Sequence, residues 1–350
     1  MKHVSTLGAV TALLLSSALL SSCSLFAGGD DPGDDTVTLV VHGSFDLPTE
    51  LVEQFEQESG LTLRITEGGD GGSLTNALAL NVNNPTGDVA FGVDNTFASR
   101  AIDEGVFAEY VVDLPSGADE LRLDGEGANR MIPIDQASVC VNVDLAWFAA
   151  REMPPPESLA DLADPTYRDL FVAPGATTST PGMAFLLATI AEYGDEWPAY
   201  WEKLVANGVE LAEGWEDAYY GSFTAAAEQG ERPIVVSYDT SPAFTIDDAG
   251  NTTTRALLDT CFRQVEYAGV LRNAKNPEGA QRVIDFLLSD EVQAALPTSM
   301  YVFPVNDEVA LPEDWAAFAE KPTDPKDVDP AEIAANRADW LTRWTEIISR

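Results

Sequence analysis

Histidine, cysteine and basic residues are all scarce in this chain of 350 residues, which has 2 His, 3 Cys and 19 Lys+Arg. The histidines are His3 and His42, and the patterns CxxC, HExxH and G-x-S-x-G do not occur. Zinc enzymes and enzymes with a histidine-based triad need such residues. The sequence therefore argues against both classes.

The shortage of basic residues produces a formal net charge of −39, because 58 Asp+Glu accompany only 19 Lys+Arg. A chain this negative repels nucleic acid, so DNA and RNA are excluded as partners. The same field attracts cationic solutes. The plainer interpretation is that most of the acidic residues only form a solvated surface, as charge runs usually do.

A largely apolar run lies near the N-terminus. Lys2 and His3 precede residues 4–20, a run too short and wrongly flanked for a stable membrane span but typical of a secretory signal. The run ends in LSSC, which resembles a bacterial lipobox, so residues 1–22 are predicted to be a removable signal and Cys23 to be lipid-modified. A plain cleaved signal is the alternative. Residues 23–36, rich in Gly and Asp, are predicted to be a flexible tether.

Two further cysteines, Cys140 and Cys261, lie in strand-like runs. Outside the cytoplasm an even pair favours a disulfide, and the geometry is possible if the two strands are neighbours. Two buried free thiols are the alternative.

From residue 36 onward, strand and helix patterns alternate, which predicts an α/β protein with parallel strands. Ser73 is predicted to cap the second helix, and residues 280–296 are predicted to form one amphipathic helix. The predicted strands are 37–45, 61–68, 88–94, 131–148 and 260–273, and the other predicted helices are 47–60, 73–84, 97–107, 180–194 and 331–350. Residues 154–175 are predicted to supply a loop, a helix and a strand, and residues 231–244 a strand followed by a turn.

Two of the predicted strands are suited to cross between lobes, because the run 131–148 is long and the run 260–273 returns later in the chain. They predict two α/β lobes, one from residues 37–132 plus 262–300 and one from residues 133–261 plus 301–350. A cleft between the lobes would lie at the carboxyl ends of strands, where open α/β sheets bind ligands.

Several short motifs match one known family in their order and spacing. They are DGGSL (70–74), GVDN (92–95), STPG (179–182), GWEDAY (214–219), SYDTSPAF (237–244) and LPTSMYVFPV (296–305). With these motifs the chain resembles the periplasmic thiamine-binding proteins of ABC importers, which have the two-lobed type II solute-binding fold. The resemblance covers about residues 37–350. It implies a protein that captures thiamine and its phosphate esters and delivers them to a membrane permease without chemistry.

The resemblance also implies which residues contact the ligand. Thiamine carries a thiazolium cation that cannot lose its charge, and aromatic faces stabilise such a cation by roughly 0.5–2 kcal/mol per good contact. Trp215 matches the family's stacking tryptophan, whereas Asp239 and Tyr301 stand where relatives have threonine and tryptophan. The predicted ligand-binding residues are Asp70, Gly71, Ser179, Thr180, Trp215, Tyr238, Asp239, Thr240, Ser241 and Tyr301. The second choices are His42, Ser44, Asp94, Asp135 and Tyr219.

Other functions remain open at the level of sequence. A receptor of the same fold for a polyamine or ferric ion also fits the composition, but the order of the motifs favours thiamine. The adjacent Tyr219 and Tyr220 resemble the tyrosine pair of ferric-ion-binding proteins only poorly, because thiamine-binding proteins carry aromatic residues in this segment and no His accompanies the pair. A secreted hydrolase with paired carboxylates lacks a marked nucleophile. We therefore expect a monomeric, non-enzymatic binding protein with no cofactor and no metal. We expect it on the outer face of the cytoplasmic membrane as a lipoprotein, or in the periplasm.

Overall fold

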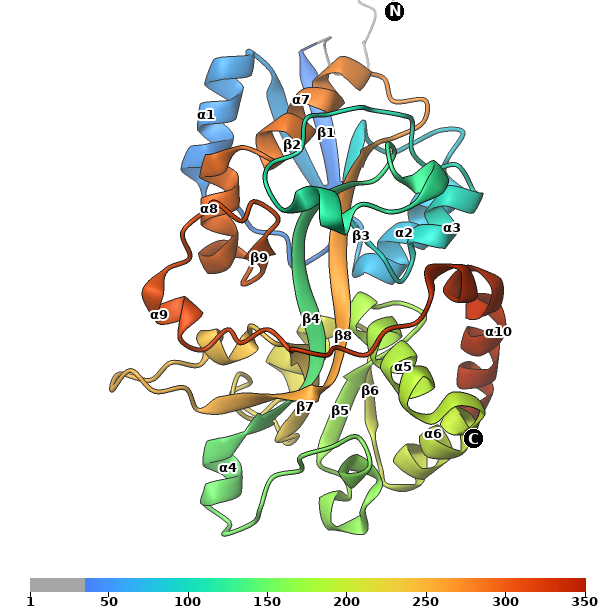
Figure 1. The fold of residues 1–350 in the computed structure, drawn as a ribbon, viewed down its shortest axis with the longest axis vertical. Helices are drawn as coiled ribbons and strands as arrows, with labels where there is room; N and C mark the ends of the chain where they lie inside the picture. Colours follow the sequence, from blue (N-terminus) through green and yellow to red (C-terminus); the bar gives the residue numbers. More distant parts are fainter. Residues whose placement is uncertain (1–34) are drawn as a thin grey trace, which may run out of the picture. The chain divides into compact units, whose positions relative to one another are not determined.

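The structure is a computed structural model that describes residues 35–350. The predicted signal 1–22, Cys23 and nearly all of the tether 23–36 lie outside the described residues. The described strands form one nine-stranded sheet in the order β2-β1-β3-β8-β4-β7-β5-β6, and β9 pairs with β4. Figure 1 shows helices packed against this sheet at both of its ends.

The strands are β1 Thr36–Val41, β2 Thr62–Glu67, β3 Val89–Asp94, β4 Ile132–Asp144, β5 Phe171–Pro174, β6 Glu210–Ala212, β7 Ile234–Tyr238, β8 Thr254–Val270 and β9 Phe303–Pro304. The helices are α1 Thr49–Ser59, α2 Gly71–Leu80, α3 Ala98–Asp103, α4 Leu145–Ala149, α5 Thr180–Tyr193, α6 Trp197–Ala206, α7 Pro277–Leu287, α8 Asp290–Ser299, α9 Glu313–Ala316 and α10 Pro330–Ile348. A π-helical turn, Asp217–Ser222, and a 3-10 turn, Ser241–Phe244, lie beside the site described below.

The two-lobed α/β prediction is confirmed. One lobe is built around β1, β2 and β3 and the other around β5, β6 and β7, and β4 and β8 connect the two (Figure 1). β8 has 17 residues, so it extends about 55 Å at the usual rise of a strand. This length lets one strand contribute to both lobes.

The strands within each lobe are parallel, as the alternating pattern predicts. The crossing strands differ, because β8 is antiparallel to both β3 and β4, and β4 is antiparallel to β7. The sheet is therefore mixed. An antiparallel central pair follows from the connectivity, since one crossing strand leaves the first lobe and the other returns to it.

The structure joins Cys140 on β4 to Cys261 on β8 in a disulfide. Both cysteines are buried, and they lie where the pairing of the two strands shifts register. The bond therefore links the two strands that connect the lobes.

Three local predictions were wrong. The strand predicted over residues 131–148 ends at Asp144, whose side chain caps helix α4 at Leu145–Ala149 by accepting from the Trp147 N–H. Ser73 lies inside α2, and the cap of this helix is Asp70, whose side chain accepts a hydrogen bond from the Gly71 backbone N–H. The single helix predicted over residues 280–296 is two helices, because the Ser289 side chain caps a new helix that begins at Asp290. In all three places a side-chain oxygen that caps the first turn, from Asp70, Asp144 or Ser289, sets where the helix begins.

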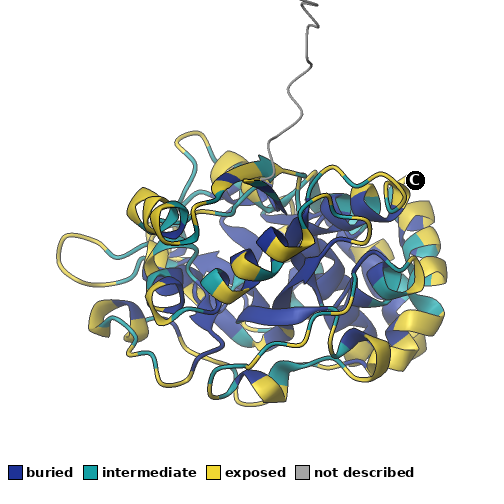
Figure 2. Cartoon of the chain, turned by 90° about the horizontal axis from the view of Figure 1, so that it is seen from above, coloured by how far each residue is buried: buried dark blue, intermediate teal, exposed yellow. Residues whose placement is uncertain are grey.

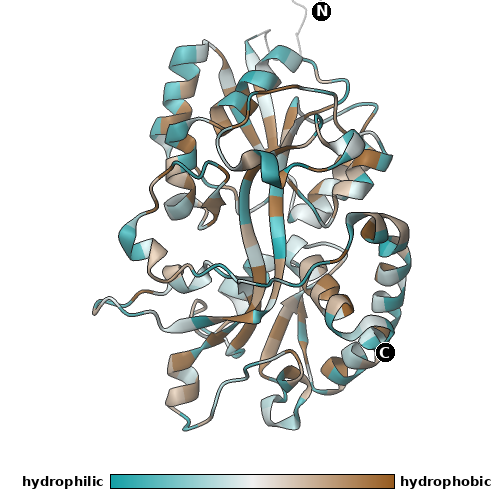
Figure 3. Ribbon diagram, viewed as in Figure 1, coloured by the Kyte–Doolittle hydropathy of each residue, from teal (hydrophilic) through white to brown (hydrophobic). Residues whose placement is uncertain are grey.

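The core follows the strands and the inner helix faces. Figure 2 shows buried strands inside and exposed residues on the outer faces of the helices, and Figure 3 shows apolar residues concentrated along the strands. Residues Thr180–Ile190 of α5 are all buried, which agrees with the strongly apolar sequence of this helix. α5 thus holds its N-terminus at a fixed position beside the cleft.

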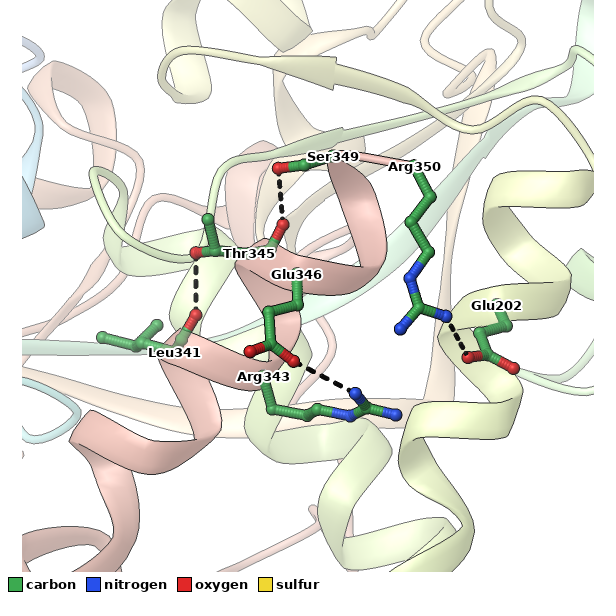
Figure 4. Close-up of polar contacts among 7 residues, drawn as sticks. All are labelled: Glu202, Leu341, Arg343, Thr345, Glu346, Ser349 and Arg350. Carbon is green, nitrogen blue, oxygen red and sulfur yellow. Dashed lines mark hydrogen bonds and ion pairs between the residues drawn. The ribbon is translucent and has the colours of Figure 1, made fainter.

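The last helix, α10, packs against α6 through Trp344 and Trp201, whose ring centroids are 5.6 Å apart. Arg350 extends this contact, because its Nη1 donates to Glu202 Oε1 at 3.0 Å (Figure 4). The chain end is therefore tied to the second lobe.

Candidate ligand-binding site

A cavity between the lobes collects residues from distant parts of the chain. It has about 50 Å³ of open space, less than the roughly 300–1,000 Å³ typical of ligand pockets. Its narrowness has a visible cause, because the rings of Phe244 and Tyr301 lie with centroids 3.5 Å apart. A ligand of vitamin size therefore needs these rings or the lobes to move. The lining residues are His42, Ser44, Asp70, Gly71, Thr180, Trp215, Tyr238, Thr240, Ser241, Phe244, Glu266, Met300, Tyr301 and Val302.

Most of the predicted ligand-binding residues meet at this cavity. The lining includes eight of them: Asp70, Gly71, Thr180, Trp215, Tyr238, Thr240, Ser241 and Tyr301. The second choices His42 and Ser44 line it as well. Residues separated by more than two hundred positions are brought together because the strand and helix ends of both lobes face the cleft.

Five predicted residues do not line the cavity. Ser179 is fully buried and caps α5, with its Oγ accepting from the Gly182 N–H. Tyr219 is buried behind Trp215, and the rings stack at 5.0 Å between centroids. Asp94 and Asp135 are buried below the cavity beside Glu266.

Asp239, the fifth, faces a different hollow of about 460 Å³ that also includes Lys321. Its Oδ1 accepts from the Ser138 N–H at 3.0 Å. Burial raises the pKa of Asp239 to about 7. The aromatic residue that lines this hollow, Phe303, is already covered by the Lys321 ammonium at 4.1 Å. The aromatic cavity is therefore the better candidate site.

Aromatic side chains form one wall of the cavity. Trp215 lies at its centre, 6.0 Å from the Tyr238 ring and 5.4 Å from the Tyr220 ring between centroids. The Trp215 indole N–H donates to Ser237 Oγ at 2.9 Å, which fixes the plane of the ring. The wall thus offers a preset aromatic face to a ligand.

Asp70 connects the two sides of the cleft. Its Oδ1 accepts from the Gly71 N–H at 2.6 Å and from the Thr180 N–H at 3.0 Å, and its Oδ2 accepts from the Trp215 N–H at 2.8 Å. The carboxylate therefore sits at the N-termini of both α2 and α5, where the helix dipoles favour a negative charge. Gly71 permits this approach, because a Cβ there would overlap the Thr180 hydroxyl.

Two hydroxyl groups in the lining have unused hydrogen-bonding capacity. Thr180 Oγ1 and Thr240 Oγ1 are buried and have no hydrogen-bond partner among the described residues. Ser241 differs, because its Oγ lies 2.7 Å from Ser237 Oγ and accepts from the Tyr238 N–H. Buried polar atoms without partners are uncommon in folded proteins, so the two threonines are suited to bind a polar ligand group.

The floor of the cavity is acidic. Glu266 lines it, and its Oε2 lies 3.6 Å from His42 Nε2. The interaction with Glu266 raises the pKa of His42 above its ordinary value, although burial opposes the shift. No Lys or Arg is among the lining residues. The site thus combines aromatic faces with negative charge, an arrangement suited to an organic cation.

Sequence reasoning missed Phe244, Glu266, Met300 and Val302. Phe244 and Met300 lie inside motifs that the sequence analysis had already singled out, SYDTSPAF and LPTSMYVFPV. Glu266 has a detectable signal of its own, because it is a charged residue within the otherwise apolar run VEYAGV. A lone charge in a buried strand indicates a partner or a function.

None of the helices within 35–350 combines the length and hydrophobicity needed to cross a bilayer. In the same part of the chain, His, Cys, Asp and Glu side chains do not gather in a group of three that could hold a metal ion.

Comparison with known proteins agrees with this architecture. Residues 84–324 match the family model of the bacterial extracellular solute-binding proteins. The thiamine-binding periplasmic protein of Escherichia coli (strain K12) is 33% identical over 301 residues, which cover 85% of this chain and 87% of that protein. A solved periplasmic thiamin-binding protein superimposes with a TM-score of 0.79 at 30% identity, covering 90% of this chain and 96% of the other.

The chain therefore belongs to the bacterial extracellular solute-binding proteins, with the type II fold. Within this family, the relatives at 30–33% identity that it matches over most of its length are thiamine-binding periplasmic proteins. The iron-bound HitA of Pseudomonas aeruginosa has the same fold, with a TM-score of 0.67 at 20% identity. That likeness concerns the fold alone.

Proposed function

We propose that this protein captures thiamine in the aromatic cavity and delivers it unaltered to an ABC importer. The observation that carries the proposal is the composition of the cavity, in which the Trp215 wall stands over the acidic floor at Glu266 and no Lys or Arg takes part. The thiamine-binding names of relatives at 30–33% identity support the same ligand.

Each part of the ligand has a matching surface. The thiazolium ring stacks on the indole of Trp215, where the ring quadrupole attracts a cation. Glu266 supplies the counter-charge. Thr180 Oγ1 and Thr240 Oγ1, which lack partners among the described residues, bind the polar groups of the ligand. Phe244 and Tyr301 move apart to admit the ligand and close over it.

The proposal involves binding and release without chemistry. A nucleophilic enzyme needs a hydroxyl or thiol activated by a neighbouring base. In the cavity the Ser241 hydroxyl is held by Ser237 Oγ and the Tyr238 N–H, and His42 faces Glu266. We therefore assign no catalytic residue and no cofactor.

The proposed location follows from the predicted signal and from the periplasmic relatives. The exported chain carries thiamine to a permease in the cytoplasmic membrane, and lipid on Cys23 anchors it to the outer face of that membrane. Nucleic acid has no part in this role, and a single copy of the chain is the working unit.

Isothermal titration calorimetry of the purified mature protein with thiamine tests the proposal. We expect one binding site per chain with saturable heat, together with a change in tryptophan fluorescence. Spermidine and ferric citrate serve as competitors, and the thiamine phosphates are titrated in parallel. Absence of heat and of fluorescence change with thiamine, in a folded preparation free of co-purified ligand, would refute the proposal. Saturable binding of spermidine or iron, without binding of thiamine, would show that the protein is a receptor for that cation instead.

A further inference from the structure

Three buried carboxyl groups lie side by side below the cavity, on three neighbouring strands. Asp94 at the end of β3 pairs in register with Glu266 on β8, and Glu266 pairs in register with Asp135 on β4. Directly opposed residues in such ladders have Cα atoms about 4.5–5.5 Å apart. Their exposed fractions are 0% for Asp94, 7% for Glu266 and 1% for Asp135.

These carboxyl groups are only partly satisfied by the protein. Asp94 Oδ1 accepts from Thr96 Oγ1 and from the Phe97 N–H. Asp94 Oδ2 and Asp135 Oδ2 are buried without a hydrogen-bond partner among the described residues. The salt bridges of the described chain include one to this cluster, from His42 to Glu266. The cluster is not arranged to chelate a metal ion.

Every element around the cluster contributes further negative or neutral groups. Burial raises the pKa of Tyr238 on β7 and of Tyr267 on β8, and the charge of Asp94 adds to both shifts, as Glu266 does for Tyr238. His42 faces Asp70 and Glu216 in addition to Glu266. Among the described residues named here around the cluster, His42 is therefore the one that can carry a positive charge.

When the cavity holds no ligand, protons bound to the aspartates reduce the repulsion between these buried carboxyl groups. Burial raises the pKa of Asp94 to about 7, and Glu266 adds to the shift. Burial and then Glu266 raise the pKa of Asp135 well above its ordinary range. The raised pKa values let both aspartates keep their protons to a higher pH than usual, and His42 lies opposite Glu266, so the net charge buried in the cluster, which is costly, is reduced.

The cavity opens onto this group through Glu266 and His42, which both line it. His42 is 9% exposed, and its Nε2 has no hydrogen-bond partner among the described residues. A permanent cation on the aromatic wall would take over the attraction that His42 and the protons now provide. It would also repel a charged imidazole.

We propose that Glu266 is the counter-charge of the bound cation, and that cation entry expels protons from the Asp94–Glu266–Asp135–His42 cluster. The inference rests on the proposed function, since it takes the ligand to be a thiamine-type cation. Linkage then fixes the sign, because a ligand that favours the deprotonated cluster binds more tightly as the pH rises. The same coupling favours release of the ligand when the cleft is acidified.

Calorimetry in two buffers tests the inference directly. Thiamine is titrated at pH 7 in phosphate and in Tris, whose ionisation enthalpies differ, so that the difference in heat gives the number of protons released. We expect about 0.5–1 proton released per thiamine, and a Kd that falls about 6- to 30-fold between pH 6 and pH 7.5. Asp94→Asn and Asp135→Asn are each expected to reduce the proton release. Asp248→Asn, which makes the same charge change in an exposed turn, should leave it unchanged.

Glu266→Gln is expected to weaken thiamine binding at least 10-fold and to remove most of the pH dependence. Circular dichroism checks that each variant is folded. The number of protons that the unmodified protein releases on binding thiamine tests the inference even where a variant fails to fold. Tight thiamine binding with no proton release and a Kd independent of pH would overturn this inference and leave the proposed function intact. Proton release that persists unchanged in both aspartate variants would overturn it as well. Absence of thiamine binding at any pH would instead overturn the proposed function.

Discussion

Replacement of Trp215 by alanine is the sharpest test of the cavity. The indole ring lies at the centre of the aromatic wall, stacked on Tyr219 at 5.0 Å and held by a hydrogen bond from its N–H to Ser237 Oγ. The backbone N–H of Trp215 still donates to Asp70 Oδ2 in the variant. Removal of the side chain therefore deletes the stacking face and leaves the loop anchored.

The expected loss of affinity combines two contributions. A cation–π contact is worth roughly 0.5–2 kcal/mol, and an aromatic pair adds about 0.5–1.5 kcal/mol beyond the area it buries. The thiamine affinity of Trp215→Ala should therefore fall by about 1–3 kcal/mol, or about 5- to 150-fold in Kd. Trp215→Phe retains a smaller ring but loses the bond to Ser237, so its loss should be smaller than that of the alanine variant.

Isothermal titration calorimetry at fixed pH and salt measures both variants. Trp147 on α4 offers a matched control, because it is a tryptophan with its own cation contact, from the Arg151 guanidinium at 3.8 Å. Trp147→Ala should leave thiamine affinity unchanged, since Trp147 does not line the cavity. A folded Trp215→Ala protein with a Kd within twofold of the original would remove the indole from the site and refute the reasoning.

Three further outcomes are expected. Asp70→Asn keeps the shape, but it removes the negative charge at the two helix N-termini and replaces one of the two oxygens that accept from the Gly71, Thr180 and Trp215 N–H groups by an NH2 donor; thiamine binding should weaken about 5- to 150-fold in titration calorimetry, and an unchanged Kd would exclude an interlobe role. Cys140→Ser should lower the free energy of unfolding by about 2–5 kcal/mol in guanidinium titrations, and the original protein should lose as much on reduction; equal stability with and without reductant would contradict a stabilising bond. Because the pKa of Asp94 is about 7 in the folded protein against 3.8 ordinarily, its contribution to stability is full at low pH and is lost as the pH rises through 7. The free energy of unfolding of the ligand-free protein, measured by thermal unfolding, should therefore fall between pH 5 and pH 8, by at most about 1.4 kcal/mol per pH unit from this group. The slope should be smaller in Asp94→Asn, and an identical slope in the two proteins would contradict this assignment.

The sequence by itself determined the features that depend on local order. Apolar runs and helical spacing are set by neighbouring residues, so most strands of both lobes and the largely buried helix α5 could be predicted, whereas the short strand β6 and helix α6 had no predicted counterpart. The aromatic motif around Trp215 and the glycine loop at Gly71 were also recognisable through their resemblance to a known family, because a binding motif keeps its residue types within a short span. These motifs identified most of the cavity lining.

The tertiary structure alone decided how distant residues combine. Glu266 acquires its place because antiparallel pairing sets it between Asp94 and Asp135, and register between strands is a long-range property that no local pattern encodes. The position of Asp70 between two helix N-termini likewise depends on how the lobes meet. Charge, burial and partners of a side chain come from its neighbours in space, and for this reason the acidic floor became visible only in the folded chain.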